Sequence, residues 1–332
     1  MNENTRSNLR KTKRRKLRKR AFLVLIPALL IFIGLSYSAY LYVKADTVFS
    51  NSYKDDGRLK SDLRAEGVNP NKDNVSILIV GVDASDVRNN KDHSRTDTLM
   101  LATLNKEDKS VKLVSIPRDT YAFIPEVGYK TKINHAHAYG GIKATIDTVE
   151  NLMEVPVDYY VKVNFEAFID VVDAIGGITV DVPYELYEQN SRDQKKAIHL
   201  LPGEQELNGE EALALARTRK YDSDIERGKR QQKIIKSIVR KGLSLDSVLK
   251  YDEIIEAVGK NMATNLTFDE MKSFISYGTG GNSLDFQTYS LKGYDYQPGG
   301  TYYYKLDEAA LEEIKQLLKE HLEISESKTS ET

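Results

Sequence analysis

The chain has 332 residues, a formal net charge of −1 and no cysteine, which excludes disulfides, thiolate catalysis and cysteine-ligated metals. The near balance of charge combines two opposite parts. Residues 1–20 carry ten lysines and arginines against the single acid Glu3, a net of +9, so the rest of the chain carries about −10.

The segment that follows this basic arm, residues 21–43, contains no charged residue and is long enough to cross a bilayer as a helix. Three tyrosines near its end are typical of a membrane interface, and the basic arm predicts a cytoplasmic N-terminus. The alternative is a cleaved signal peptide. The apolar run is longer than a usual signal core, and a tyrosine follows Ser38-Ala39 where cleavage would occur. We therefore predict an uncleaved single-pass anchor in the cell membrane, with everything after Lys44 extracellular.

Residues 44–73 are polar and lack a clear period, which favours a stalk, and the Ser/Thr/Glu-rich tail 323–332 is expected to be disordered. Between them, residues 74–322 mix apolar runs with helical spacing. This pattern predicts one α/β domain with a central mixed β-sheet flanked by helices. The predicted strands are 75–83, 98–104, 111–116, 159–163, 178–182 and 286–291, and the predicted helices are 142–153, 165–175, 209–216, 225–242, 246–258, 268–277 and 307–322.

Two aspartates flank the loop after the first predicted strand. Asp83 ends that strand, and Arg95-Thr96-Asp97-Thr98 opens the next. Ligands of α/β proteins gather beyond the carboxyl ends of strands. Two carboxylates there would suit Mg²⁺ or Mn²⁺ shared with substrate phosphates, which Arg95 could also contact. The alternative is that an aspartate at a strand end serves only as a turn or cap residue.

A second motif, Ser115-Ile116-Pro117-Arg118-Asp119, follows a buried strand. The proline ends the strand and places Arg118 at the same sheet edge as Asp83. The alternative is a surface ion pair between Arg118 and Asp119, which would contribute little to stability.

A third segment carries His135 and His137 before Gly140-Gly141. The histidine spacing places both rings on one face only in a strand, and no third ligand type is near, so we predict packing or capping roles rather than a metal site. The glycine pair could present backbone N–H groups to an anion.

Arginine is concentrated in residues 217–232. After residue 43 only 11 of the 38 basic residues are arginine, and four of them lie in this stretch. The guanidinium fork fits phosphate bidentately, as lysine does not, so we predict an anion site. The candidate residues are Arg217 and Arg219 in the loop after one predicted helix, Asp224 near the start of the next, and Arg227 and Gln231 on one face of its N-terminal end.

Together these motifs, in this order over residues 74–242, resemble the LytR-CpsA-Psr family of bacterial envelope proteins, and the single N-terminal anchor matches as well. Ala214-Leu215-Ala216 departs from the family pattern, which often carries an aromatic residue or valine there, so no lipid contact is inferred from it. The resemblance is carried by Asp83, Arg95-Thr96-Asp97-Thr98, Ser115-Ile116-Pro117-Arg118-Asp119, the segment from Lys132-Ile133-Asn134 to Gly140-Gly141, Arg217-Thr218-Arg219, and Asp224, Arg227, Arg230, Gln231 and Gln232.

The resemblance implies a membrane-anchored phosphotransferase. Such an enzyme moves a secondary cell-wall glycopolymer, such as teichoic acid or capsule polysaccharide, from a polyprenyl-pyrophosphate carrier to peptidoglycan. The implied acceptor is the C6 hydroxyl of N-acetylmuramic acid. In these roles Asp83 and Asp97 would hold Mg²⁺ (or Mn²⁺), the pyrophosphate would lie on Arg95, Arg118, Arg217, Arg219 and Gln231, and Asp224, oriented by Arg227, would act as general base.

Three other functions are compatible with parts of the sequence. A hydrolase of the same lipid-pyrophosphate would use the same site and differ only in acceptor access, so the sequence leaves it open. A membrane-bound regulator of envelope genes that binds nucleic acid is disfavoured, because the large domain is acidic and predicted outside the cytoplasm. A non-catalytic wall-binding scaffold is disfavoured by the cluster of charged motifs.

Overall fold

The computed structural model describes residues 3–82, 96–219, 223–242, 251–274 and 284–324, in two compact units, Met1–Thr47 and Val48–Thr332. Helix α1 (Glu3–Ser52) begins in the first unit. It contains a stretch, Leu25–Ser52, that is long and apolar enough to cross a membrane by length and composition. This helix supports the predicted single-pass anchor.

The second unit is built on a six-stranded mixed sheet in the order β11–β6–β1–β2–β3–β12, which confirms the predicted fold class. β1 pairs parallel with β6 and antiparallel with β2, and β3 pairs antiparallel with β2. The carboxyl ends of β1 and β3 therefore lie at the same sheet edge. The strands are β1 (Val75–Val82), β2 (Thr96–Asn105), β3 (Ser110–Ser115), β6 (Tyr159–Asn164), β11 (Met262–Thr264) and β12 (Asp285–Ser290).

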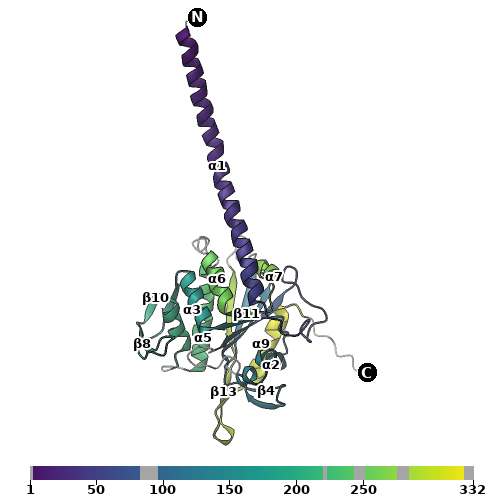
Figure 1. Ribbon diagram of the computed structural model, residues 1–332. Coiled ribbons are helices and arrows are strands. Elements are labelled where there is room, and N and C mark those ends of the chain that lie inside the picture. The colour runs from purple at the N-terminus through teal and green to yellow at the C-terminus, as the bar shows by residue number, and fades with distance from the viewer. Residues whose placement is uncertain (1–2, 83–95, 220–222, 243–250, 275–283, 325–332) are drawn as a thin grey trace. The chain divides into compact units, whose positions relative to one another are not determined.

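Helices cover both faces of this sheet (Figure 1). Helices α2 (His135–Met153) and α9 (Glu308–His321) pack on the face formed by Leu78 and Val80 of β1. The alternate residues Ile77 and Ile79 point to the opposite face, as strand geometry requires. The helices on that side are α3 (Phe165–Ala174), α5 (Asp224–Gly242), α6 (Tyr251–Asn261) and α7 (Phe268–Ser273), with α4 (Gly209–Arg217) packed beside α3 and α5.

Small two-stranded units surround the sheet, and only β7 was expected from the sequence. They are too short or too polar to give a clear period. The pairs are β4 (Tyr121–Ile124) with β5 (Tyr129–Lys132), β7 (Ile178–Val182) with β10 (Gly203–Leu207), β8 (Leu186–Glu188) with β9 (Ile198–Leu200), and β13 (Gly293–Tyr296) with β14 (Tyr303–Leu306), with the 3₁₀ turn η3 (Pro298–Gly300) between the last two.

Two segments differ from expectation. Helix α2 begins at His135 rather than near residue 142, and its regular geometry is broken at Gly140 and Gly141. Gly141 has φ +65°, in the left-handed region that favours glycine, so the chain continues through the break into the predicted helix.

Residues 53–73, expected to be part of a stalk, make specific tertiary contacts within the second unit. Arg64 pairs with Asp158 at 2.7 Å, and Arg58 pairs with Glu150 at 3.3 Å. The ion-paired side chains are largely buried, and the Arg58 guanidinium also donates to a backbone carbonyl. Polar anchoring of this kind leaves no apolar period in the sequence.

His321 joins the end of α9 to the sheet. Its ring nitrogens lie 2.7 Å from Thr103 Oγ1 and 2.8 Å from Ser110 Oγ, and burial lowers its pKa to about 4. The folded protein therefore keeps His321 neutral at a pH where the unfolded chain, with the ordinary value of 6.5, takes up a proton. This contribution to stability is complete above 6.5 and is lost as the pH falls towards 4.

We expect the free energy of unfolding to fall by about 3 kcal/mol more in wild type than in His321→Gln between pH 7 and pH 4. Urea unfolding of both proteins in detergent across this range measures the difference. Parallel pH dependences would mean that the buried ring does not control acid stability.

Candidate active site

Asp97 lies on a β-bulge where β1 and β2 end their pairing. Gly81 pairs with Thr98 and Val82 pairs with Thr96, so Asp97 is the extra residue of β2. A Cβ at Gly81 would lie 2.9 Å from Thr98 Cβ, so the close approach of the strands here requires glycine. Bulges re-aim a side chain at the edge of a sheet, and here the residue concerned is a carboxylate.

The Asp97 carboxylate brings together two arginines from distant segments. Arg118, which follows β3, donates from Nη1 to Asp97 Oδ1 at 2.6 Å, and its Nε lies 3.7 Å from Asp119 Oδ2. Arg219, which follows α4, lies 3.5 Å from the same Asp97 oxygen and 4.0 Å from Asp224 Oδ1. The structure thus groups five of the predicted or motif residues at one sheet edge.

Arg227 completes this arginine cluster from the first turn of α5. Only 4% of the residue is exposed, and Nη1 lies 2.9 Å from Asp224 Oδ1. Burial lowers its pKa to about 10, and the positive charges of Arg219 and Arg118 act in the same direction against the pull of Asp224. Arg227 stays protonated at neutral pH, and three converging guanidinium groups favour a bound anion.

Asp224 lies in the first turn of α5 but does not cap the helix. The Glu226 N–H donates to Ser223 Oγ at 3.3 Å, and the Arg227 N–H donates to the Ser223 carbonyl at 3.0 Å. Ser223 therefore caps α5, while the Asp224 carboxylate faces Arg227 and Arg219.

Asp119 and Lys132 extend the charged cluster beyond the predicted residues. Lys132 Nζ lies 2.8 Å from Asp119 Oδ1. Burial opposes ionisation of Asp119, but Lys132 and Arg118 outweigh it and hold the pKa of this carboxyl below its ordinary value. Both residues belong to the sequence motifs described above, but nothing in those motifs indicated that Asp119 and Lys132 form an ion pair.

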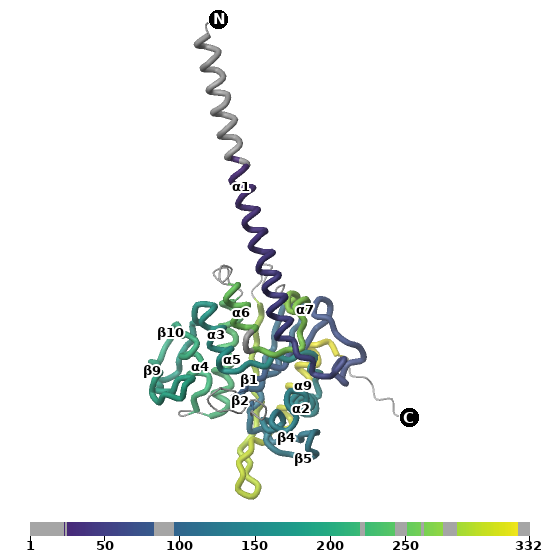
Figure 2. Tube along the Cα trace, viewed as in Figure 1, coloured from purple at the N-terminus to yellow at the C-terminus, as the bar shows by residue number. Residues whose placement is uncertain are grey.

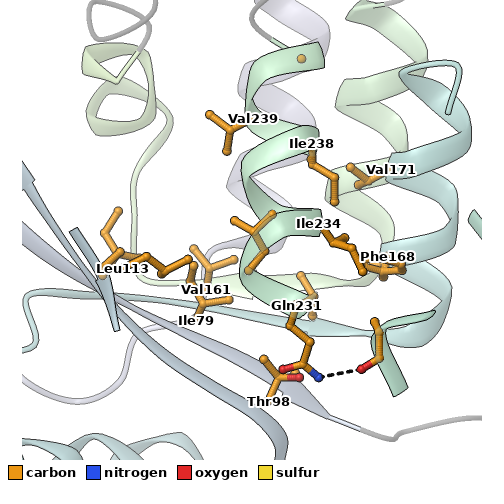
Figure 3. Close-up of a pocket in the computed structure, with 18 of the residues that line it drawn as sticks. Ile79, Thr98, Leu113, Val161, Phe168, Val171, Gln231, Ile234, Ile238 and Val239 are labelled. Atoms are coloured by element: carbon orange, nitrogen blue, oxygen red, sulfur yellow. Dashed lines mark hydrogen bonds between the residues drawn. The ribbon is translucent and has the colours of Figure 1, made fainter. Parts of the chain in front are cut away.

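Two predicted phosphate ligands are engaged by backbone carbonyls. Arg217 Nη2 donates to the carbonyls of Gln189 and Asn190, the latter at 2.9 Å. Gln231 Nε2 donates to the Ala216 carbonyl at 3.0 Å, the dashed line in Figure 3. Both side chains also line the cavity described below, so they form part of its wall.

Only part of the predicted metal site lies within the described residues. Asp83 and Arg95 lie outside the described residues, which contain no group of three His, Asp or Glu side chains placed to hold a metal. Within them, Asp97 Oδ2 has no hydrogen bond or ion pair, since its protein contacts all use Oδ1 or the backbone. Magnesium takes one or two carboxylates and completes its shell with water and phosphate, so the donor chemistry at Asp97 fits.

An apolar cavity of about 630 Å³ lies between the sheet and the helices of its second face (Figure 3). Arg227 and Val239 both line it, and residues so spaced on a helix lie about 18 Å apart. Polar residues stand near the Arg227 end, including Asp97, Arg219 and Gln231. The apolar wall includes Ile79, Leu113 and Val161 from the sheet and Phe168, Val171, Ile234 and Ile238 from the helices.

This shape accommodates an amphiphile with an apolar chain and an anionic head. No pattern in the sequence indicated the cavity, because the residues of its wall follow the same apolar periods as an ordinary core.

Comparison with known proteins gives concordant matches. A model of the LytR_cpsA_psr family matches residues 39–320. The polyisoprenyl-teichoic acid–peptidoglycan teichoic acid transferase TagT of Bacillus subtilis is 38% identical over 317 residues, covering 94% of this chain and 98% of TagT.

Solved structures match as well. TagT bound to LIIa-WTA superposes with a TM-score of 0.70 and 38% identity, covering 81% of this chain and 98% of that one. YwtF (TagT) with bound octaprenyl pyrophosphate lipid gives a TM-score of 0.66 and 35% identity, with the same coverage.

Proposed function

This chain belongs to the LytR_cpsA_psr family, and from that premise we propose that it is a membrane-anchored transferase. It moves a teichoic acid, or another secondary glycopolymer such as capsule polysaccharide, from a polyprenyl-pyrophosphate carrier to peptidoglycan. The observation that carries the proposal is the apolar cavity that ends at Arg219 and Arg227. The name of TagT and the octaprenyl pyrophosphate bound to YwtF support the same donor class.

The donor binds with its prenyl tail in the cavity and its pyrophosphate on Arg118, Arg219 and Arg227. The three guanidinium groups repel one another in the free protein, so a pyrophosphate relieves their like charge. Ion pairs with the Asp97 carboxylate position Arg118 and Arg219. Catalysis of phosphoryl transfer depends mainly on such positioning and charge stabilisation, so the proposed reaction needs no covalent intermediate on the protein.

The acceptor hydroxyl oxygen attacks the phosphorus that carries the sugar, and a new P–O bond forms. The bond from this phosphorus to the bridging oxygen breaks, and polyprenyl monophosphate leaves with that oxygen. The hydroxyl proton passes to the Asp224 carboxylate, which Arg227 orients at 2.9 Å. Arginines stabilise the charge on the transferring phosphoryl oxygens. Mg²⁺ (or Mn²⁺) on Asp97 and Asp83 would neutralise further phosphate charge when bound.

The test uses the full-length protein in detergent with a synthetic lipid-pyrophosphate glycan, peptidoglycan oligomers and Mg²⁺. Mass spectrometry should find a glycan–peptidoglycan phosphodiester and polyprenyl monophosphate, and chelator should suppress both. Release of the free glycan phosphate alone would favour the hydrolase. Full transfer in chelator would remove the metal from the proposal.

Asp224→Asn should keep donor affinity and lower the transfer rate by about 10²–10⁴-fold, because the amide keeps the shape but accepts no proton. Ser223 still caps α5 in this variant, so its thermal stability should be close to wild type. Donor binding and single-turnover transfer are measured side by side. A wild-type rate would retire Asp224 as the base.

We also propose that the catalytic domain is extracellular, because the basic arm 1–20 precedes the apolar part of α1. Protease added to intact, wall-stripped cells should digest the chain after Lys44. Complete protection would refute this orientation and, with it, access to peptidoglycan.

A further inference from the structure

The hairpin of β13 and β14 carries an unusual number of tyrosines and lies beside β4 (Figure 2). On one face Tyr296 and Tyr303 pack around Tyr121 of β4, with ring centroids 5.5 and 4.8 Å from it. Tyr302 precedes β14 and belongs to the other face, where its hydroxyl donates to Asp295 at 3.0 Å. The Tyr121 face is therefore occupied by its own rings, whereas Tyr302 is directed elsewhere.

Tyr302 lies next to the charged cluster of the active site. The Tyr304 N–H donates to the Asp119 carbonyl at 2.8 Å, which fixes the hairpin there. Lys132 links the charged cluster to the tyrosine hairpin, because its Nζ lies 2.8 Å from Asp119 Oδ1 and 5.7 Å from the centre of the Tyr302 ring. Burial is the main cause that raises the pKa of Tyr302 to about 12. The negative charge and hydrogen bond of Asp295 act in the same direction, and Asp224 and Asp119 contribute less. The half-buried ring thus keeps its proton at the border of the charged cluster that includes Lys132 and Asp119.

The geometry of the displacement indicates which of the two substrates contacts the Tyr302 ring. In an in-line displacement the attacking and leaving oxygens lie on opposite sides of the phosphorus. The leaving lipid phosphate is at the cavity end, and Tyr302 is not among the residues that line the cavity. The acceptor must approach from the other side, past Asp224.

A sugar ring offers an apolar face of C–H groups and a polar edge of hydroxyls, which suits a tyrosine with an apolar body and a wet end. The chain has no tryptophan and 20 tyrosines, so tyrosine is its largest available ring for such stacking.

We propose that Tyr302, held by Lys132 and Asp295, is the acceptor-sugar subsite and stacks on a sugar of the peptidoglycan strand beside Asp224. The inference rests on the proposed function, because it names where that function's acceptor binds. It adds a positioning surface that none of the charged motifs described above supplies. The occupant is the acceptor sugar rather than the sugar of the donor, and the two make different kinetic predictions.

The test compares full-length wild type with Tyr302→Ala, Tyr302→Leu and Tyr302→Phe. The matched control is Tyr187→Ala, which removes an exposed tyrosine elsewhere in the fold, stacked on His199 at 4.1 Å in the β8–β9 unit. The Ala and Leu variants should raise the acceptor KM by about tenfold, the scale of a lost aromatic contact. Donor Kd and acceptor-free donor hydrolysis should stay unchanged. Phe, which keeps the ring face, and the control should behave as wild type.

An unchanged acceptor KM in both the Ala and Leu variants would overturn the inference. A raised donor Kd with an unchanged acceptor KM would assign the ring to the donor sugar and also overturn it. Should wild type itself transfer nothing, the proposed function fails, and direct titration with a peptidoglycan tetrasaccharide then decides the subsite. Binding lost in Tyr302→Ala and kept in Tyr302→Phe supports it, and equal binding in all proteins refutes it.

Discussion

Replacing Arg227 with methionine is expected to lower the transfer rate by about 10²–10³-fold, the usual loss when one preorganised donor to a developing charge is removed. Arg227 is buried, and the charges of Arg219 and Arg118 oppose its own. A methionine fills similar space without that repulsion, so the variant should unfold at the same temperature as wild type or higher. Loss of activity with retained stability is the signature of a residue kept for its chemistry.

Single-turnover transfer and thermal unfolding are measured with and without inorganic pyrophosphate. Pyrophosphate should stabilise wild type and have a smaller effect on Arg227→Met, because a ligand stabilises only the protein that binds it. Lys229→Met on the same helix is the control, since Lys229 is exposed and pairs only with Glu226 at 2.6 Å among the described residues. Arg227→Met with wild-type turnover would show that the buried charge is structural.

Replacing Ile79 with tryptophan should strongly weaken binding of long-chain donors while the protein remains folded. Ile79 lies in the sheet wall of the cavity, opposite Ile234 and Ile238 of α5 (Figure 3). The larger side chain takes up space that the prenyl tail would occupy. Each CH₂ excluded from an apolar site costs about 0.8 kcal/mol, so excluding a single five-carbon unit weakens binding by about 3–4 kcal/mol.

Chain length provides the control for this variant. Geranyl pyrophosphate, with two isoprene units, should bind wild type and Ile79→Trp with similar affinity, whereas a donor with eight or more units should bind wild type much more tightly. Thermal unfolding should show no loss of stability, because the substitution fills a cavity rather than overpacking the core. Equal affinity for the long-chain donor in both proteins would place the tail elsewhere.

Five strands of the central sheet and most long helices could be predicted from their apolar runs and helical spacing, whereas β11 (Met262–Thr264) was not expected. β1, β2 and β3 are largely apolar and buried along most of their length, β6 is buried at Tyr159 and Tyr160, and α5 has a regular apolar stripe. The family resemblance read from the motifs is confirmed by the match to residues 39–320. The short hairpins could not be predicted, since three or four residues do not establish a period.

The order and chemistry of the charged motifs are properties of the sequence alone. Arg219 and Arg227 in the arginine-rich stretch already indicated an anion site, because the guanidinium fork binds phosphate bidentately, and Asp97 together with Asp83 indicated a metal site. Tertiary structure decided how they are used. The bulge at Asp97 depends on pairing between two strands, and the contact of Arg118 with Asp97 depends on the antiparallel order of three strands.

The cavity, the Asp119–Lys132 pair and the position of Tyr302 were decided only by the tertiary structure. An apolar residue that lines a cavity and one that fills a core have the same period and composition, and only the distance between sheet and helices distinguishes them. Lys132 and Tyr302 are brought together from separate hairpins by backbone contacts such as that of Tyr304 with Asp119. Local sequence determined which side chains the protein possesses, and long-range packing determined which of them share a site.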